Sequence, residues 1–286
     1  MRHRNPVLLL MSLLALAIPS LLGGVRPARA DAPPAYDGKP GTESGQQCVN
    51  PRDGAVMVWV PAGGFTMGSK DDDKDASANE KPQRQVTLDG YWIDKNLVTA
   101  AQYRKFCDDT GRRMPDPPDW GWKDDHPIVN VSWDDSKAYA DWAGASLPTE
   151  AQWEKAARGT DGRKYPWGNR FDRGRLWCSQ HAVGDAGRTA PVGSFPKGAS
   201  PYGALDMAGN VWEWCADWYS PDYHGAPTNN PTGPATGEYR VVRGGSWIGD
   251  GDDEIGFGCA ERGGNGVEPD IRIYNYGFRC VVRAGG

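Results

Sequence analysis

The sequence predicts an α+β fold that is rich in loops. Strand-like segments come first, three segments with helical periodicity follow, and irregular strands close the chain, an order typical of this class. The composition agrees, because 13 Trp, 38 Gly and 23 Pro combine with a low mean hydropathy and argue against a helical bundle. The roughly 250 residues that follow the N-terminal segment suffice for one large domain.

Residues 1–30 have the pattern of a secretory signal peptide. A charged start, Met1–Arg4, precedes the apolar run Val7–Leu22 and the small-residue cleavage pattern Ala28–Ala30. An uncleaved membrane anchor is the alternative, but the cleavage pattern argues against it. We therefore expect an exported protein, periplasmic or secreted, with no stable membrane insertion.

The mature chain is acidic. The full sequence has 32 basic and 37 acidic residues and a formal net charge of −5. Residues 1–30 contain four arginines and no acid, so removing them leaves a net charge of −9. Such a chain is a poor candidate for binding nucleic acid or an anionic membrane surface. The expected partner is an exported ligand or protein whose identity the sequence does not give.

A linker is predicted before the folded domain. Residues 31–50 are rich in Pro, Gly and Ser and lack an apolar period, so they predict a linker, and residues 51–286 predict the domain. The charged stretch 70–84 predicts a mobile loop. Predicted strands cover 55–60, 65–68 after a turn at Gly63 and Gly64, and 85–94.

Three helices are predicted from the same start and stop signals. Each begins at a Ser or Thr that is followed three residues later by Gln or Asp, a capping box, and each ends at a glycine. The pairs are Thr99 with Gln102, Ser132 with Asp135 and Thr149 with Gln152, and the glycines are Gly111, Gly144 and Gly159.

All six cysteines lie in the exported part of the chain. An even number in an oxidising compartment predicts disulfides, although the sequence leaves the pairing open. No pair has the CxxC spacing of a zinc or thioredoxin-like motif. The cysteines are Cys48, Cys107, Cys178, Cys215, Cys259 and Cys280.

Two stretches carry residues suited to binding or catalysis. Arg240–Arg283 combines glycines and aromatic residues between two strand-like segments, which predicts a loop-built site or, alternatively, a plain surface loop. In Leu205–Glu213, two carboxylates lie seven residues apart around a glycine turn. Calcium prefers such oxygen ligands, although acids of this kind are often only solvated. The predicted calcium ligands are the side chains of Asp206 and Glu213 and the carbonyls of Gly209 and Val211.

The chain resembles the sulfatase-modifying-factor family, whose best-known member is the formylglycine-generating enzyme. The C-terminal signature is the run Arg-Val-Val-Arg-Gly-Gly-Ser-Trp at 240–247 followed by Gly-Phe-Arg-Cys at 277–280. The resemblance implies a C-type-lectin-like core with little regular secondary structure. Further matching blocks lie in family order at 57–69, 97–106, 126–158, 165–169 and 203–214.

The resemblance implies one structural calcium site and casts doubt on a second. The family binds structural calcium through the positions that match Asp206, Gly209, Val211 and Glu213. A second family site has an asparagine where this chain has Arg175, with Asp185 as a possible further ligand. Because an arginine cannot ligate a cation, we expect the second site to be weakened or lost.

The cysteine pair of the formylglycine-generating enzyme is replaced in this chain. In that enzyme the two cysteines lie two and seven residues past the aromatic of the Gly-Gly-Ser-aromatic motif, bind copper and activate oxygen. The matching positions are Gly249 and Glu254, which supply no thiolate for copper, so we do not expect copper. The resemblance also places Cys259 and Cys280 at structural disulfide positions, but their usual partners fall on Ala140 and Ala157.

The remaining candidates surround the same loop. Glu254, Arg262 and Ser246 are the candidate catalytic residues, with Glu254 as acid or base and Arg262 holding an anionic group. A solvated acidic loop is the alternative. The candidate ligand-binding residues are Trp247, Asp250, Asp252 and Tyr274.

Three functions follow from these expectations. The first is an exported binding or accessory module, because in some relatives this C-terminal segment is a variable binding surface. The second is an enzyme with altered chemistry, similar to a periplasmic relative in pyoverdine maturation that also lacks the cysteine pair. Formylglycine formation comes last, because the cysteine pair that carries it is absent.

Overall fold

The computed structural model describes residues 32–179, 188–223, 225–248 and 255–283, and those from Pro33 onward belong to one unit. The predicted signal peptide lies outside these residues. Within the described part of the chain, no helix is long and apolar enough to cross a membrane.

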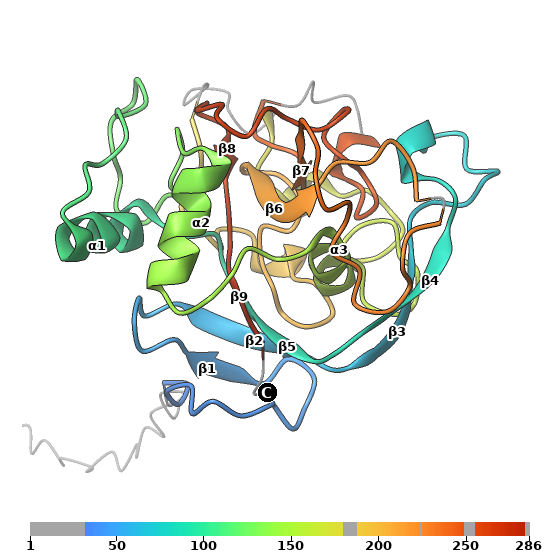
Figure 1. Ribbon diagram of the computed structural model, residues 1–286, viewed down its shortest axis with the longest axis horizontal. Helices are drawn as coiled ribbons and strands as arrows, with labels where there is room; N and C mark the ends of the chain where they lie inside the picture. Colours follow the sequence, from blue (N-terminus) through green and yellow to red (C-terminus); the bar gives the residue numbers. More distant parts are fainter. Residues whose placement is uncertain (1–31, 180–187, 224, 249–254, 284–286) are drawn as a thin grey trace, which may run out of the picture. The chain divides into compact units, whose positions relative to one another are not determined.

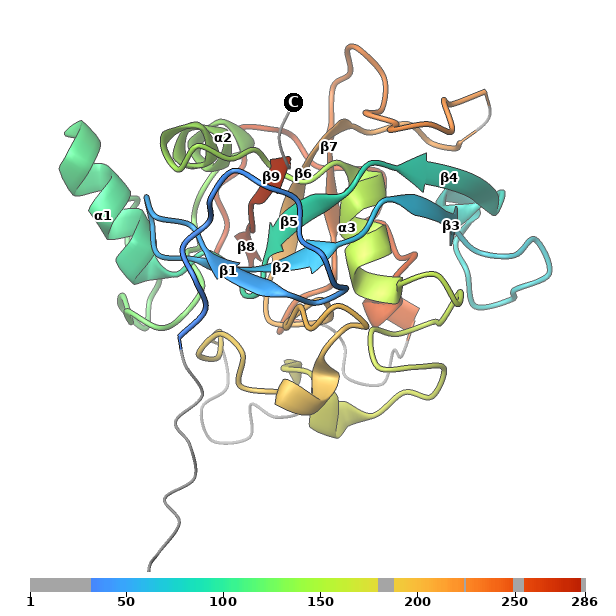
Figure 2. The same ribbon diagram turned by 90° about the horizontal axis from the view of Figure 1, so that it is seen from below.

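A four-stranded antiparallel sheet joins the two ends of the domain. Its strand order is β1-β2-β5-β9, so the first and last strands of the described chain lie in the same sheet (Figure 1). The segment that leads into β9 runs between α2 and α3 in both views (Figures 1 and 2). The strands are β1 (Gln47–Val49), β2 (Val56–Val60), β5 (Tyr91–Asp94) and β9 (Val281–Arg283), and the helices are α2 (Trp133–Trp142) and α3 (Glu150–Arg158).

Two smaller sheets complete the β structure. β3 (Gly63–Met67) pairs with β4 (Arg84–Leu88) in an antiparallel hairpin. β6 (Trp212–Trp218) lies between antiparallel β7 (Arg240–Arg243) and parallel β8 (Tyr276–Gly277). The third sheet therefore fixes both ends of the loop region that the sequence identified as a site.

The three helices form where their capping boxes predict them. α1 (Ala100–Thr110), α2 and α3 each have the predicted Ser or Thr as N-cap, with the reciprocal hydrogen bonds of a capping box. Each such cap contributes roughly 1 kcal/mol of helix stability. Gly111 ends α1 with a positive φ of 70°, which a glycine adopts without steric cost.

Three local predictions are wrong. The predicted strand 85–94 is divided into β4 and β5, which belong to different sheets. Within the predicted linker, residues 47–49 form β1, and Tyr36 donates its backbone N–H to the Val49 carbonyl. Isolated apolar side chains explain the difference, because Cys48 and Tyr36 pack in a cluster with Trp92. The predicted turn at Gly63 and Gly64 instead belongs to β3, since both glycines pair with β4.

α3 lies at the centre of the domain. All nine of its residues are buried, and it packs against β3, β6 and β7. Trp153 joins the main apolar core. The polar residues of α3 are buried as well: Glu154 pairs with Arg243 of β7, and Lys155 donates to the carbonyls of Pro61 and Gly63 at 2.7 and 2.9 Å. This helix therefore ties the sheets together through charges as well as through apolar packing.

Candidate functional site

A tight glycine turn after β7 positions the candidate site residues. Gly244 and Gly245 have φ values of 99° and 75°. A Cβ at Gly245 would lie 2.7 Å from the Gly256 carbonyl oxygen and from the Phe257 ring. The turn therefore requires glycine both for its conformation and for its close packing. Ser246 and Trp247 follow it directly and lie beside the start of β6.

Three aromatic side chains meet beyond this turn. The ring centroids of Trp247 and Trp120 are 5.7 Å apart, those of Trp247 and Tyr274 are 5.8 Å apart, and those of Trp120 and Tyr274 are 6.2 Å apart. We call Trp120, Trp247 and Tyr274 the aromatic triad. Trp247 is buried, whereas Tyr274 is 44% exposed, so the triad runs from the core to the surface. The exposed ring of Tyr274 can contact a ligand, while its packing against the two tryptophans holds it in place.

Buried polar groups lie next to the triad. Asn275 donates from Nδ2 to Ser246 Oγ over 3.1 Å, and the Ile248 backbone N–H donates to the same oxygen over 3.3 Å. Neither Trp247 Nε1 nor Asn275 Oδ1 has a hydrogen-bond partner within the described part of the chain. A buried donor and a buried acceptor without partners are costly, and a ligand could satisfy both.

The surface around the triad carries further apolar side chains. Ile248 and Ile271 are 42% and 37% exposed. Both lie within a few residues of triad members along the chain. Together with Tyr274, they give this region apolar surface that the folded chain does not cover.

Several predicted site residues lie outside the described residues. These are Gly249 and Glu254, which replace the cysteine pair, and the ligand-binding candidates Asp250 and Asp252. Of the sequence-predicted set, the structure brings Ser246, Trp247 and Tyr274 together.

The structure places Arg262 away from the triad, in a buried ion pair. Its Nε lies 2.6 Å from Glu150 Oε1, and its Nη1 donates to the carbonyls of Asn79 and Ser220. The guanidinium also lies over the Tyr223 ring. Burial acts to raise the pKa of Glu150, but Arg262 and Arg243 hold it below its usual value. The guanidinium is thus fully engaged, which does not suit the predicted role of holding an anionic ligand.

The predicted calcium ligands surround a buried arginine. Both carboxylate oxygens of Glu213 accept hydrogen bonds from Arg279, at 2.6 and 2.9 Å. Asp206 has a φ of 54° and accepts from the Gly193 backbone N–H over 2.7 Å. Burial raises the pKa of Asp206 to about 6, and the charge of Glu213 adds to the shift. Both carboxylates are therefore buried; Arg279 binds Glu213 directly, and its charge also acts to lower the pKa of Asp206.

A cation at this place would compete with Arg279 for the Glu213 oxygens and would need backbone oxygens to complete its site. No group of three or more His, Cys, Asp or Glu side chains among the described residues could hold a metal ion. A site at Asp206 and Glu213 would need the carbonyls of Gly209 and Val211, as the sequence predicts. Calcium at these four residues stays a prediction. At the second family position, Arg175 pairs with Asp172 at 2.7 Å, and Asp185 lies outside the described residues.

The predicted disulfides are not formed. All six cysteines are described and buried, and the structure contains no disulfide among them. Their physical role is apolar packing, because the sulfur atoms are distributed over four core clusters. Burial raises the pKa of the Cys259 thiol to about 12 and that of Cys280 well above its usual value.

Sequence reasoning missed two residues of this region. Trp120 comes from the loop before α2, and Asn275 directly precedes β8. A signal for Trp120 was present, because Trp120 and Trp122 follow a proline-rich segment, and aromatic residues on loops are frequent in binding sites. Nothing local in the sequence marks Asn275 as a partner of Ser246.

Comparisons with known proteins agree with the motifs. The model of the sulfatase-modifying factor enzyme 1-like domain matches residues 42–284. A formylglycine-generating enzyme of Thermomonospora curvata is 37% identical to this chain in an alignment 286 positions long. The alignment covers 79% of this chain and 93% of that protein. A mouse protein named inactive C-alpha-formylglycine-generating enzyme 2 is 33% identical over 282 residues, covering 80% of this chain and 86% of the relative.

A solved structure supports the same fold. The structure of PvdO from Pseudomonas aeruginosa aligns with a TM-score of 0.73 and 28% identity. The alignment covers 84% of this chain and 99% of that chain. The α+β fold predicted from the sequence is thereby confirmed as the fold of these proteins.

Proposed function

Because the chain belongs to the sulfatase-modifying factor enzyme 1-like family, we propose that it uses this family's fold as an exported binding or accessory module. The aromatic triad and the polar groups beside it form the face that takes a ligand or a partner protein. Copper-dependent oxidation of a sulfatase cysteine is not part of this function.

The observation that carries the proposal is the pair of buried polar atoms beside the triad. Trp247 Nε1 is a donor and Asn275 Oδ1 an acceptor, and both lack a partner among the described residues. A ligand that stacks on Tyr274 and reaches these atoms would gain hydrogen bonds that the free protein does not make. Such a ligand is flat or contains an aromatic group, with a polar edge.

The cysteines support a function other than copper oxidation. Cu(I) prefers soft thiolate ligands, and the family positions for them are Gly249 and Glu254 in this chain. The cysteines that are present are buried in the core. The raised pKa of Cys259 and Cys280 further opposes thiolate formation.

Family membership alone does not decide activity. A named formylglycine-generating enzyme and a relative named inactive match this chain at 37% and 33% identity. The function must therefore be argued from the site.

Calcium would serve this face structurally. The side chains of Asp206 and Glu213 and the carbonyls of Gly209 and Val211 would hold it. The ion would supply positive charge to two buried carboxylates that share Arg279. Trp247 donates its backbone N–H to the Asn210 carbonyl. An ion that holds residues 206–213 in place would therefore also fix the position of Trp247 in the triad.

A second candidate is an enzyme with altered chemistry acting on a small molecule. The similarity to the PvdO structure at a TM-score of 0.73 favours it. In that case Glu254 would act as acid or base and Ser246 would position the substrate. Arg262 is not available for this role, since Glu150 and two carbonyls engage it. Formylglycine formation is the third candidate.

A fragment screen tests the binding proposal. Aromatic fragments with a polar edge are screened against the mature chain, residues 31–286, by ligand-observed NMR. The proposal expects hits whose affinity falls at least about tenfold in Trp120→Ala and Tyr274→Ala. Tyr239→Ala is the matched control, because Tyr239 is 39% exposed but lies outside the triad. Hits that bind all three variants equally would place binding elsewhere and overturn the proposal.

A further inference from the structure

A pocket lies between the end of α3 and the segment 68–83. Its volume is about 350 Å³, near the lower end for ligand sites, so a small metabolite fits it better than a drug-sized molecule. None of its lining residues belongs to the aromatic triad. The pocket is therefore a site separate from the aromatic triad, and a ligand in it is independent of the proposed function.

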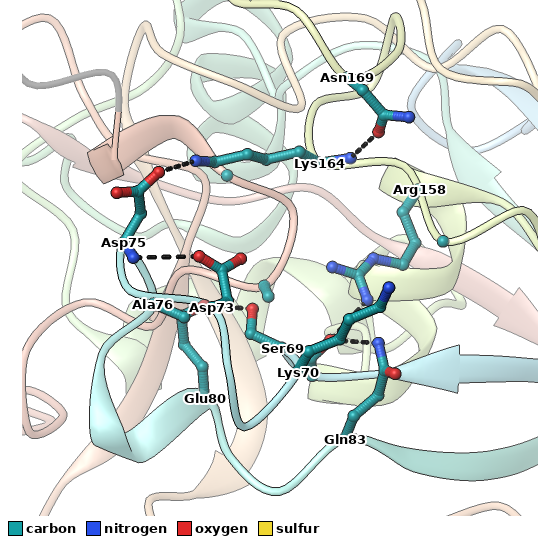
Figure 3. A pocket seen from close by; sticks show the side chains of 14 residues that line it. Ser69, Lys70, Asp73, Asp75, Ala76, Glu80, Gln83, Arg158, Lys164 and Asn169 are labelled. Atoms are coloured by element: carbon teal, nitrogen blue, oxygen red, sulfur yellow. Dashed lines mark hydrogen bonds and ion pairs between the residues drawn. The ribbon is translucent and has the colours of Figure 1, made fainter.

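Arg158 presents a free edge to this pocket. The side chain is 5% exposed, and its Nη1 is engaged with the carbonyls of Thr66 and Gly68 at 3.1 and 2.8 Å and with Glu154 at 3.2 Å. The Nε atom is buried and lacks a hydrogen-bond partner within the part of the chain that the structure describes. Figure 3 shows the guanidinium directed toward the space between Lys164 and the Ser69–Lys70 segment.

The chemistry of the free edge selects a planar oxyanion. In a guanidinium, the Nε–H bond and one Nη2–H bond point in the same direction, which matches the two oxygens of a carboxylate. Within the described chain, no hydrogen bond from Nη2 opposes such a ligand, since the recorded partners of Arg158 all contact Nη1. Lys70 adds a second cation, because it lines the pocket and its exposed ammonium has no partner among the described residues.

The pocket also contains an acid with an open oxygen. Asp73 uses Oδ1 to accept from the Asp75 backbone N–H over 3.0 Å, and its Oδ2 has no partner within the described ranges. The other two acids are occupied: Asp75 pairs with Lys164 at 2.9 Å, and Glu80 accepts from Ser69 Oγ at 2.7 Å (Figure 3).

The charges of the lining therefore balance. Three cations face three acids, and the groups that stay open are the Nε–Nη2 edge of Arg158, the Lys70 ammonium and one oxygen of Asp73. The cations are Lys70, Arg158 and Lys164, and the acids are Asp73, Asp75 and Glu80. A doubly charged anion would meet three carboxylates, and a metal cation would meet three cations, so neither complements this lining.

We propose that this pocket binds a small zwitterion, an amino acid or a short peptide with free ends. Its carboxylate lies on the Nε–Nη2 edge of Arg158 beside Lys70, and its ammonium group lies on Asp73. The ligand thereby satisfies the buried Nε donor and the open carboxylate oxygen at once, which no singly charged ligand does.

Ligand-observed NMR on the mature chain tests this proposal. The probes are the common free amino acids and glycylglycine, each compared with its N-acetylated and its C-amidated form, and with acetate, sulfate and phosphate. At least one zwitterion is expected to bind and to lose roughly tenfold or more in affinity when either end is blocked. Binding of acetate, sulfate or phosphate with equal affinity would show a simple anion site and overturn the proposal, as would the absence of binding by every probe.

Variants on the loop locate the two ends of the ligand. Lys70→Ala and Asp73→Asn each change one exposed or half-buried charge and are expected to weaken binding roughly tenfold. Lys74→Ala and Asp72→Asn are matched controls in the same segment that do not line the pocket. Arg158→Lys keeps the charge but removes the paired donors, and thermal unfolding verifies that this variant folds. Unchanged affinity in Lys70→Ala and Asp73→Asn would place the ligand elsewhere.

Discussion

Arg262 and Glu150 form a buried ion pair whose Nε–Oε1 distance is 2.6 Å, although 112 positions separate them in the chain. Glu150 is the first residue of α3, and the backbone of Arg262 forms an isolated antiparallel β-bridge with Arg243 of β7. The pair therefore joins the central helix to the C-terminal segment that carries the candidate site. A residue that the sequence suggests as catalytic has a structural position instead.

Replacing Arg262 should destabilise the whole domain. Arg262→Met leaves Glu150 buried without its main partner, and breaking a buried pair from one side costs about 3–5 kcal/mol. Urea unfolding of the variant measures the loss. Arg272→Met is the matched control, because Arg272 pairs with Asp135 at 2.8 Å with a side chain that is 51% exposed. Exposed pairs contribute about 0–1 kcal/mol, so equal losses in the two variants would contradict the structural role of Arg262.

Asp217 should make stability fall as the pH rises toward neutrality. Burial raises the pKa of Asp217 from 3.8 to about 7, and the charge of Glu150 adds to this shift. Between these two pH values the folded chain holds a proton that the unfolded chain has released. The stability supplied by that proton is complete below the unfolded value of 3.8 and is lost as the pH approaches about 7.

Asp217→Asn isolates this contribution. An asparagine oxygen can still accept the hydrogen bond that the Glu150 backbone N–H donates to Asp217 over 2.8 Å. Relative to wild type, the variant should therefore gain stability as the pH rises from 3.8 to about 7, with no further gain above. Urea midpoints of both proteins across this range measure the difference. A difference that stays constant with pH would show that Asp217 ionises normally.

Calcium should stabilise the wild-type chain through Asp206. An ion that binds only the folded state at 100 times its dissociation constant adds about 2.7 kcal/mol to the free energy of unfolding. Asp206→Ala should abolish the calcium-dependent rise in melting temperature, whereas Asp108→Ala, an exposed acid on α1, should retain it. If chelation of calcium leaves the wild-type melting temperature unchanged, the predicted site does not bind the ion.

How much the sequence could predict depends on how local each signal is. The helix starts at Thr99, Ser132 and Thr149 are confirmed, because a capping box lies within four consecutive residues. The glycine turn before Ser246 and Trp247 is local in the same sense. Periodicity and the order of the elements predicted the α+β class, and the family motifs added the C-type-lectin-like core to this prediction.

The rest depends on contacts between distant residues. β1 forms because Cys48 and Tyr36 reach the Trp92 cluster, which the composition of residues 31–50 does not reveal. The hydrogen bond between Ser246 and Asn275 joins residues 29 positions apart across a loop. The number of cysteines predicted disulfides, but in the structure these side chains are buried by packing in four core clusters and none is paired.

Mass spectrometry of a sulfatase-type peptide tests the central claim most directly. The mature chain is incubated with copper, a reductant and a Cys-x-Pro-x-Arg peptide, beside the Thermomonospora curvata formylglycine-generating enzyme as positive control. The account predicts that the control converts the peptide cysteine to formylglycine and that this chain leaves it unchanged, because Gly249 and Glu254 provide no thiolate pair. Conversion by this chain would contradict the account and would mean that residues other than a cysteine pair can carry out the oxidation.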